Sequence, residues 1–194
     1  MPFQMPVGPP QLWAFQALSI VFFLFLLRAF WRRSGETGSK PDPRSRIGIL
    51  LQVIGIFAVG LGPPKIVLQP FAPASLGETA TVVVLMGGAI WLFAASSSAL
   101  GKNWSVVARM RSDHELVRSG PYARVRHPIY LGLLLFLLAM AVALGHWLQL
   151  VVAVPLYLAG TEIRTRIEDR LLEQTFGDAF RDYRNSTPAL LPRL

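Results

Sequence analysis

The sequence contains no cysteine, only three histidines, and few charged residues for its length. Of its 194 residues, 15% are charged and 53% are hydrophobic, whereas a soluble domain carries about 25% charged residues. The absence of cysteine excludes disulfide bonds and thiolate metal sites. The three histidines are far apart in the chain and do not have the spacing of metal ligands, so the sequence predicts no metal site.

The chain contains several long runs of residues with almost no charge. A helix that crosses the hydrocarbon core of a bilayer needs about 20 mostly apolar residues. Such runs occupy residues 11–30 (with one charge at Arg28), 47–68 (with one charge at Lys65), 79–100 and 129–160. The last run is too long for one span and is interrupted at residues 145–147, which predicts a helical hairpin of residues 129–144 and 147–161. We therefore predict an all-α integral membrane protein with about five transmembrane helices.

The basic residues indicate how these helices are oriented. The chain has 19 Lys and Arg residues, which gather between the first and second spans, between the third and fourth, and after the fifth. Only Lys65 falls near the opposite face. The positive-inside rule then places the N-terminus outside and the C-terminus in the cytoplasm. Topology and contact with anionic membrane lipids account for the net charge of +8, so no nucleic acid partner is predicted.

The first ten residues contain no Lys or Arg, so they do not have the basic start of a cleavable signal peptide. The first apolar run is also long enough to be a retained anchor. Together with the small size of the chain, this favours a bacterial or archaeal inner membrane over the endoplasmic reticulum.

Two polar segments flank the predicted hairpin, at residues 101–128 and after residue 160. In the second segment, apolar side chains recur every three to five residues and form one face of an amphipathic helix. Both segments emerge on the predicted cytoplasmic face, so they can meet there. The sequence thus divides into residues 1–99, with the first three helices, and residues 100–194, with a cytoplasmic loop, the hairpin and a C-terminal amphipathic helix that forms a pocket.

Three sequence blocks in the second part carry a family resemblance. Residues 120–132 read GPYARVRHPIYLG, which resembles the GPY-x-x-x-RHP-x-Y-x-G signature of the isoprenylcysteine carboxyl methyltransferase family and its phospholipid methyltransferase relatives. Residues 100–105 (LGKNWS) and 164–177 (RTRIEDRLLEQTFG) resemble that family's LG-x-NWS and R-x-x-x-EE-x-x-L-x-x-x-FG segments. One position departs from the pattern, because Asp169 stands where the family has Glu.

The resemblance implies a methyltransferase that uses S-adenosylmethionine and acts on a lipophilic acceptor from the bilayer. The family's acceptor is the C-terminal carboxylate of an isoprenylated cysteine, or a similar lipid carboxylate. The resemblance also implies roles for individual residues. Arg164 would orient the acceptor carboxylate, and Glu168 and Asp169 would hold the amine or the ribose of the cofactor. The remaining cofactor-binding residues would line the donor pocket or belong to a lid formed by residues 112–126: Tyr122, Arg126, His127, Pro128, Tyr130 and Gly132.

The chemistry of the residues agrees with this interpretation. Methyl transfer from a sulfonium requires alignment of donor and acceptor and exclusion of water, more than acid–base catalysis. A carboxylate acceptor is already ionised at neutral pH, whereas an amine acceptor would need a base to take its proton. No G-x-G-x-x-G fingerprint of a dinucleotide-binding fold occurs in the chain.

Three alternatives stay open from the sequence. A phospholipid N-methyltransferase would differ only in having an amine acceptor. An NADPH-dependent membrane reductase of the sterol-reductase type resembles this family in its C-terminal region, although it would be expected to have more spans and more basic contacts for the cofactor phosphate. A membrane scaffold with a vestigial motif would bind no cofactor.

Overall fold

The structure is a computed structural model, and it describes residues 5–31, 42–101, 104 and 115–191. The beginning of the predicted lid, residues 112–114, lies outside these residues, as do residues 34–41 of the polar segment 34–45, which the sequence predicts to be a connector between the first two helices. The described part of the chain forms six α-helices and two short 3₁₀ helices. In chain order these are α1 (Pro9–Trp31), α2 (Arg44–Val59), α3 (Pro73–Leu100), η2 (Gly120–Ala123), α4 (Pro128–Leu144), η3 (Trp147–Gln149), α5 (Leu150–Phe176) and α6 (Asp178–Ser186).

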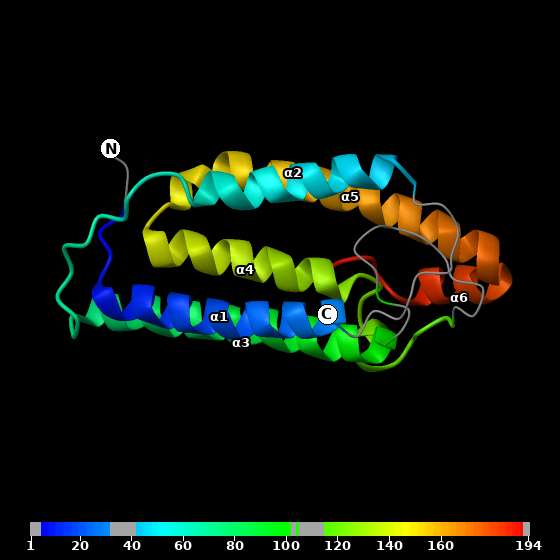
Figure 1. Ribbon diagram of the computed structural model, residues 1–194, viewed down its shortest axis with the longest axis horizontal. Coiled ribbons are helices and arrows are strands. Elements are labelled where there is room, and N and C mark those ends of the chain that lie inside the picture. Colours follow the sequence, from blue (N-terminus) through cyan, green and yellow to red (C-terminus); the bar gives the residue numbers. More distant parts are fainter. Residues whose placement is uncertain (1–4, 32–41, 102–103, 105–114, 192–194) are drawn as a thin grey trace.

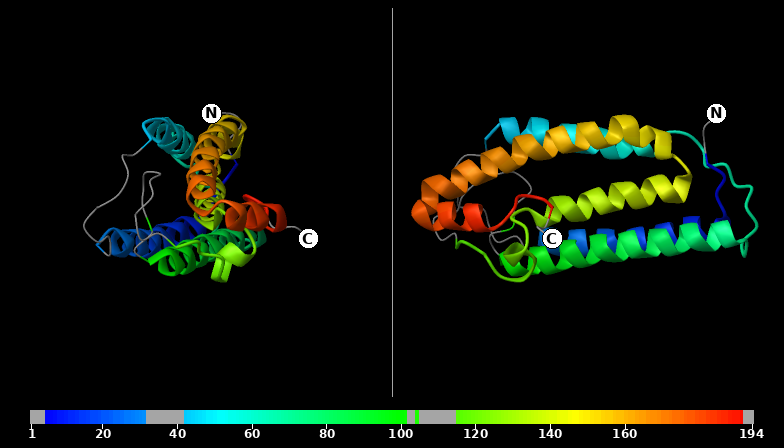
Figure 2. Two further views of the ribbon diagram at one scale, coloured as in Figure 1. Left: turned by 90° about the vertical axis from the view of Figure 1, so that its right-hand side faces the viewer. Right: turned by 180° about the vertical axis from the view of Figure 1, so that it is seen from behind.

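The all-α prediction is confirmed for the described residues, in which the only β-type pairing is an isolated bridge between Val7 and Ile66. Helices α1 to α5 run alongside one another in one elongated bundle (Figure 1). Helix α2 packs along α5, and α3 packs along both α1 and α4. Figure 2 shows the bundle end-on, with α4 between the α1–α3 pair and the α2–α5 pair. Helix α6 lies at the end of the bundle where α4 begins.

Two of these helices, α1 and α3, are long and apolar enough to cross a membrane. Helix α4 is strongly apolar but has 17 residues, and α2 has 16. The second half of α5 carries several charged residues. The structure therefore shows two helices of the predicted kind, and five spans remain a prediction.

The predicted hairpin is present, but its second helix is longer than expected. Helix α4 ends at Leu144, and the next residue, Gly145, adopts a left-handed conformation with φ of 69° that glycine tolerates best. Helix α5 then continues past the predicted boundary at residue 161 and ends only before Gly177, where φ is 53°. The predicted fifth span and the polar helix after it are thus one continuous helix. It continues because Thr161, Arg164 and Thr165 are buried within the bundle.

Glycines allow α2 and α5 to lie unusually close together. A Cβ atom added to Gly160 of α5 would lie 2.5 Å from the carbonyl oxygen of Gly48 and 2.9 Å from the backbone nitrogen of Gln52. A Cβ atom added to Gly55 would lie 2.8 Å from the carbonyl oxygen of Ala153. Small residues at such contacts let membrane helices approach backbone to backbone. This close packing places the middle of α2 directly beside the polar part of α5.

Candidate functional site

The start of helix α4 is fixed by residues that lie far away in the sequence. Pro128 is the first residue of α4. Proline suits this position because the first N–H groups of a helix have no acceptor within the helix, so its missing N–H costs no hydrogen bond. His127 precedes it, and its backbone N–H donates to the carbonyl of Ala189 at 2.9 Å. The N–H of Arg126 donates to the carbonyl of Pro188, also at 2.9 Å. Residues 188–189 therefore form a strap that holds His127 in place.

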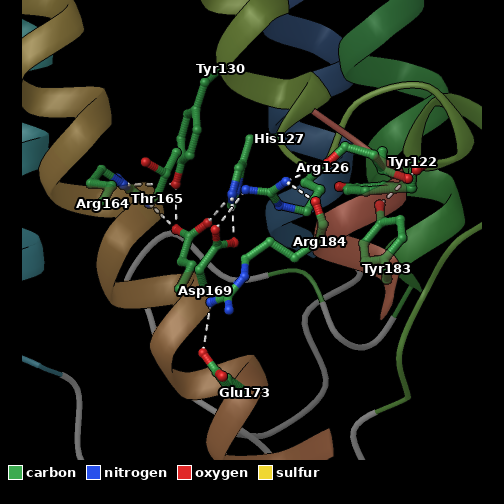
Figure 3. Close-up of polar contacts among 12 residues, drawn as sticks. Tyr122, Arg126, His127, Tyr130, Arg164, Thr165, Asp169, Glu173, Tyr183 and Arg184 are labelled. Carbon is green, nitrogen blue, oxygen red and sulfur yellow. Dashed lines mark hydrogen bonds and ion pairs between the residues drawn. The ribbon is translucent and has the colours of Figure 1, made fainter. Parts of the chain in front are cut away.

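The His127 side chain lies between two carboxylates of α5. Its Nε2 is 3.0 Å from Oδ1 of Asp169, and its Nδ1 is 3.4 Å from Oε2 of Glu168. The imidazole is almost completely buried, with 5% of its side chain exposed. Figure 3 shows the ring pointing from the start of α4 toward α5. An imidazole with a carboxylate at each nitrogen is arranged to carry a proton on both.

These contacts shift the pKa values of all three groups, which lie beyond the apolar parts of their helices. Burial lowers the pKa of His127, but hydrogen bonds to Asp169 and Glu168 and their negative charges outweigh this effect, so the pKa is raised. Burial raises the pKa of Asp169, but the hydrogen bond and charge of His127 and the contact with Arg126 lower it overall. The pKa of Glu168 is also lowered, because His127 and Arg164 outweigh the effect of burial. The contacts within the cluster thus favour the protonated form of the histidine and the ionised form of each carboxylate.

Tyr130 and Arg164 extend this cluster along the bundle. The Nε of Arg164 donates to the hydroxyl oxygen of Tyr130 at 2.8 Å, and the Tyr130 hydroxyl donates to Oε1 of Glu168. The guanidinium of Arg164 also lies 3.5 Å from the same carboxylate oxygen and 5.1 Å from the centre of the Tyr130 ring. Arg164 is buried, with 6% of the residue exposed. Its guanidinium is therefore held in a fixed orientation.

Arg126 joins the cluster to the C-terminal elements of the chain. Its guanidinium forms an ion pair with Asp169 at 2.9 Å and donates to the backbone carbonyls of Arg184 and Thr187. Next to it, the hydroxyl of Tyr183 on α6 donates to the carbonyl of Tyr122 at 2.6 Å. Helix α6 is thus docked on the segment that carries the GPY and RHP motifs (Figure 3).

A cavity of about 920 Å³ opens beside this cluster. Most of its wall consists of apolar side chains from α1, α2 and α4, including Phe22, Ile56, Leu133 and Phe136. One end is polar. Six of the residues predicted from the sequence line the cavity: Tyr122, Arg126, His127, Tyr130, Arg164 and Glu168.

The other three predicted site residues lie outside the cavity wall. Asp169 is held behind it by Arg126 and His127. Pro128 is buried at the start of α4. Gly132 faces α3, where an added Cβ would lie 3.2 Å from the carbonyl oxygen of Ala89. We interpret these three as residues that position the site.

A polar cavity residue of α2 was not singled out from the sequence. Gln52 of α2 is buried and lines the cavity near Arg164. The sequence does contain an indication of its role, because a polar amide side chain within an apolar membrane-type run is energetically costly and often marks a functional site. Among the residues that the structure describes, no group of three His, Asp or Glu side chains is arranged to hold a metal ion.

Comparison with known proteins shows the family of this chain. The phospholipid methyltransferase family matches residues 78–179, more than half of the sequence. The chain belongs to the phospholipid methyltransferase family. The match begins within α3 and contains both the RHP motif and the Glu168–Asp169 pair of α5.

Relatives of this family member include two yeast enzymes. Protein-S-isoprenylcysteine O-methyltransferase of Schizosaccharomyces pombe is 31% identical over 87 residues, which are 45% of this chain and 37% of the relative. The enzyme of the same name from Saccharomyces cerevisiae is 30% identical over 87 residues, or 45% of this chain and 36% of the relative. These matches confirm the resemblance inferred from the three sequence blocks.

A bacterial relative is the cobalt-zinc-cadmium resistance protein CzcN of Cupriavidus metallidurans. It is 38% identical over 103 residues, which are 51% of this chain and 46% of CzcN. The matched part of this chain therefore covers less than half the length of each of the three relatives.

The stability of this family member should have a maximum in mildly acidic solution. The raised pKa of His127 contributes stability that is fully present below the pKa of an unfolded histidine and is lost as the pH rises through the raised value. The lowered pKa values of Glu168 and Asp169 contribute stability that is present above the pKa of unfolded carboxylates and is lost as the pH falls through the lowered values. The plateau should lie at about pH 4.5–6.5.

Thermal unfolding of the detergent-solubilised protein across a series of pH values measures this profile. In a His127→Gln variant, the loss of stability on the alkaline side should become shallower, because the group that releases its proton there is gone. An unchanged alkaline slope in this variant would show that another group is responsible.

Proposed function

We propose that this protein is an S-adenosylmethionine-dependent methyltransferase that methylates the carboxylate of a lipophilic acceptor, such as an isoprenylated cysteine. The observation that carries this proposal is the position of the polar cluster. His127, Arg164 and Glu168 lie at one end of a cavity whose remaining wall is mostly apolar. A cavity of this kind suits a reaction between a polar methyl donor and an acceptor with a long hydrocarbon chain.

The residues at the polar end fit an S-adenosylmethionine molecule. Glu168 lines the cavity, its side chain is 26% exposed, and its carboxylate is ionised, so it can accept hydrogen bonds from the ammonium group of the cofactor. Tyr122, Arg126 and His127 line the same end and would contact the rest of the molecule. The bound cofactor would supply a methyl group on a sulfonium, from which the methyl carbon bonds to an acceptor oxygen while the carbon–sulfur electron pair stays on sulfur.

The ionisation of the cluster favours a carboxylate acceptor over an amine. His127 holds its proton between two carboxylates, and Glu168 and Asp169 have lowered pKa values, so all three are poor bases. An ammonium acceptor would need a base before methylation, whereas a carboxylate needs none. The guanidinium of Arg164 can orient such a carboxylate through charge-assisted hydrogen bonds. The task left to the protein is alignment of the two reactants.

The arrangement of the helices supports entry of the acceptor from a bilayer. Helix α1 packs on α3 and α2 packs on α5, and residues of both helix pairs and of α4 line the apolar cavity. Figure 2 shows the two pairs on either side of α4. Because α2, α4 and the first part of α5 run alongside the two membrane-length helices, we propose that all five cross the membrane. The N-terminus would then lie outside and the polar cluster at the cytoplasmic face. In this arrangement residues 100–194 supply the charged cluster, and residues 1–99 supply much of the apolar wall.

Titration calorimetry of the detergent-purified protein tests the donor half of the proposal. S-Adenosylhomocysteine, the product of methyl transfer, should bind, and NADPH in a parallel titration should not. Replacing Glu168 by Gln should weaken binding by roughly 10-fold or more, because a hydrogen bond to an ionised group is lost. The matched control is Glu162→Gln on the same helix, whose carboxylate is 59% exposed and pairs with Arg166 away from the cluster.

Each contrary outcome identifies a different alternative. Binding of NADPH alone would indicate a reductase, and binding of neither ligand would indicate a scaffold. Equal weakening by both glutamate variants would show that Glu168 has no special role in donor binding. Transfer of a labelled methyl group to phosphatidylethanolamine, with none to a prenylated cysteine, would make the protein an N-methyltransferase.

A further inference from the structure

Tyr157 is a buried tyrosine of α5 that the proposed reaction does not use. None of its surface is exposed, and it is absent from the described residues that line the cavity. Its hydroxyl donates a hydrogen bond of 2.7 Å to the main-chain carbonyl of Tyr130, the third residue of α4. A carbonyl oxygen has two lone pairs, so it can accept this bond in addition to a bond within its own helix. Tyr157 therefore holds the backbone of α4.

This hydrogen bond joins two helices that have few other contacts. Helix α4 packs mainly along α3, and α5 packs mainly along α2, although α4 and α5 are consecutive in the chain. An extensive helix contact fixes the relative position of two helices because the side-chain ridges of one fill the grooves of the other. Between α4 and α5 such a contact is small, so individual hydrogen bonds determine how the start of α4 lies along α5.

Tyr157 lies on the same face of α5 as the polar cluster. Positions 157, 161, 164 and 168 follow at spacings of four, three and four residues, which places them on one side of a helix. Arg164 and Glu168 bind the hydroxyl of Tyr130, whereas Tyr157 binds its carbonyl oxygen. Helix α5 thus holds Tyr130 at both ends, by its main chain and, about two turns further along, by its hydroxyl.

Helix α2 is connected to the same face. The Nε2 of Gln52 donates to Oγ1 of Thr161 at 2.9 Å, and the side chain of Thr161 forms a hydrogen bond with the Tyr157 hydroxyl. Since the proton of the Tyr157 hydroxyl is directed to Tyr130, Thr161 is the donor in this pair. The hydrogen bonds therefore run in one direction, from α2 through α5 to the main chain of α4. In such a chain each bond polarises and strengthens the next.

We propose that Tyr157 is a positioning residue for methyl transfer, which keeps Tyr130 where its hydroxyl bridges Arg164 and Glu168. This inference rests on the proposed function, in which Arg164 orients the acceptor and Glu168 binds the donor. The Tyr130 hydroxyl contacts both side chains, so a shift of Tyr130 disturbs the alignment of the two reactants. A misplacement of about 1 Å can lower the rate of such a reaction by about 100-fold.

Removal of the Tyr157 hydroxyl tests this inference, with S-adenosylmethionine as donor and N-acetyl-S-farnesylcysteine as acceptor. A Tyr157→Phe variant should lose about 10-fold in kcat, because its reactants are less well aligned. Its KM for the acceptor and its affinity for S-adenosylhomocysteine should change by less than about twofold, because neither ligand loses a contact.

A Gln11→Met variant controls for the loss of a buried bond to α4. Gln11 of α1 is fully buried, and its Nε2 donates to the main-chain carbonyl of Val142, near the other end of α4, at 3.3 Å. This variant loses the same kind of contact as Tyr157→Phe, far from the polar cluster. Its kcat should stay within about twofold of the wild-type value, since the alignment of the reactants is unchanged.

A double-mutant cycle distinguishes positioning through Tyr130 from a general structural effect. In a protein that already carries Tyr130→Phe, the further change Tyr157→Phe should lower kcat by less than about twofold, because residues that act as a unit have non-additive effects. If Tyr157→Phe does not fold, Thr161→Val takes its place in the cycle. It removes the donor to the Tyr157 hydroxyl and should cause a smaller loss of kcat.

Three results would overturn the inference and leave the proposed function standing. They are an unchanged kcat in the Tyr157 variant or its Thr161 substitute, equal losses of kcat in the Tyr157 and Gln11 variants, and losses that multiply in the double variant. Absence of methyl transfer by the wild-type protein would overturn the proposed function and this inference together.

Discussion

Replacing Arg164 by glutamine should lower kcat/KM for methyl transfer by about 100-fold, the effect expected when a buried charged donor is removed from a reaction site. The guanidinium holds the Tyr130 hydroxyl at 2.8 Å and pairs with Glu168 at 3.5 Å. Without it, the proposed acceptor carboxylate would lose its cationic partner, and Tyr130 would lose a hydrogen bond that fixes its orientation. A labelled-methyl assay at several acceptor concentrations measures the loss.

The matched control for Arg164 is a second arginine on the same helix. Arg166 is exposed, with 76% of its side chain accessible, and pairs only with the exposed Glu162. An Arg166→Gln variant should retain activity within about twofold, because exposed ion pairs contribute little. Binding of S-adenosylhomocysteine separates the two roles of Arg164, since a residue that orients the acceptor should leave donor binding nearly unchanged. Equal activities of the Arg164 and Arg166 variants would show that Arg164 has no special role in the reaction.

Replacing Gly160 by alanine should lower the free energy of unfolding by about 2 kcal/mol, in the range of other overpacked cores. The added Cβ would come within 2.5 Å of the carbonyl oxygen of Gly48 and 2.9 Å of the backbone nitrogen of Gln52. Backbone atoms cannot move aside as a flexible side chain can, so α2 and α5 must separate. For a protein of this size, the unfolding temperature in detergent should fall by roughly 4–8 °C.

Gly87 of α3 provides the control for this substitution. It also lies within an apolar helix, but an added Cβ would have no atom within 4 Å. A Gly87→Ala variant should be as stable as the wild type or slightly more stable, because alanine favours the helix. The same decrease in unfolding temperature for both variants would mean that the close contact between α2 and α5 does not contribute to stability.

The positions of the helices could be read from the sequence because hydrophobic runs and their interruptions determine them. The predicted helix 129–144 corresponds to α4 within one residue, and the run 79–100 covers α3 except for its first six residues. The end of the fifth helix could not be read in this way. Polar residues such as Thr161 and Arg164 mark the end of an apolar run, but here they are buried against neighbouring helices, and tertiary packing keeps the chain helical.

The candidate site was predictable to the extent that its residues belong to motifs. His127, Tyr130, Arg164 and Glu168 come from two sequence blocks, and the structure brings their side chains into one bonded cluster. The different positions of Glu168 and Asp169 were not predictable. Adjacent residues of a helix point in directions about 100° apart, and the contacts of Asp169 with Arg126 and His127 leave Glu168 as the carboxylate that lines the cavity.

The contribution of α2 was beyond prediction for another reason. Gln52 belongs to no recognised motif, and it meets Thr161 only because glycines bring two helices together that lie far apart in the sequence. Pairing between helices of this kind depends on shape, which a hydrophobic pattern does not contain.

The strap formed by residues 188–189 has a consequence for biosynthesis. The N–H groups of Arg126 and His127 obtain their partners from the carbonyls of Pro188 and Ala189, more than sixty positions later in translation. While the ribosome is still making α6, the histidine can be inserted beside the membrane but not yet locked between its carboxylates. A premature stop before codon 188 should therefore yield a polypeptide that contains every residue of the cluster and holds its histidine loosely.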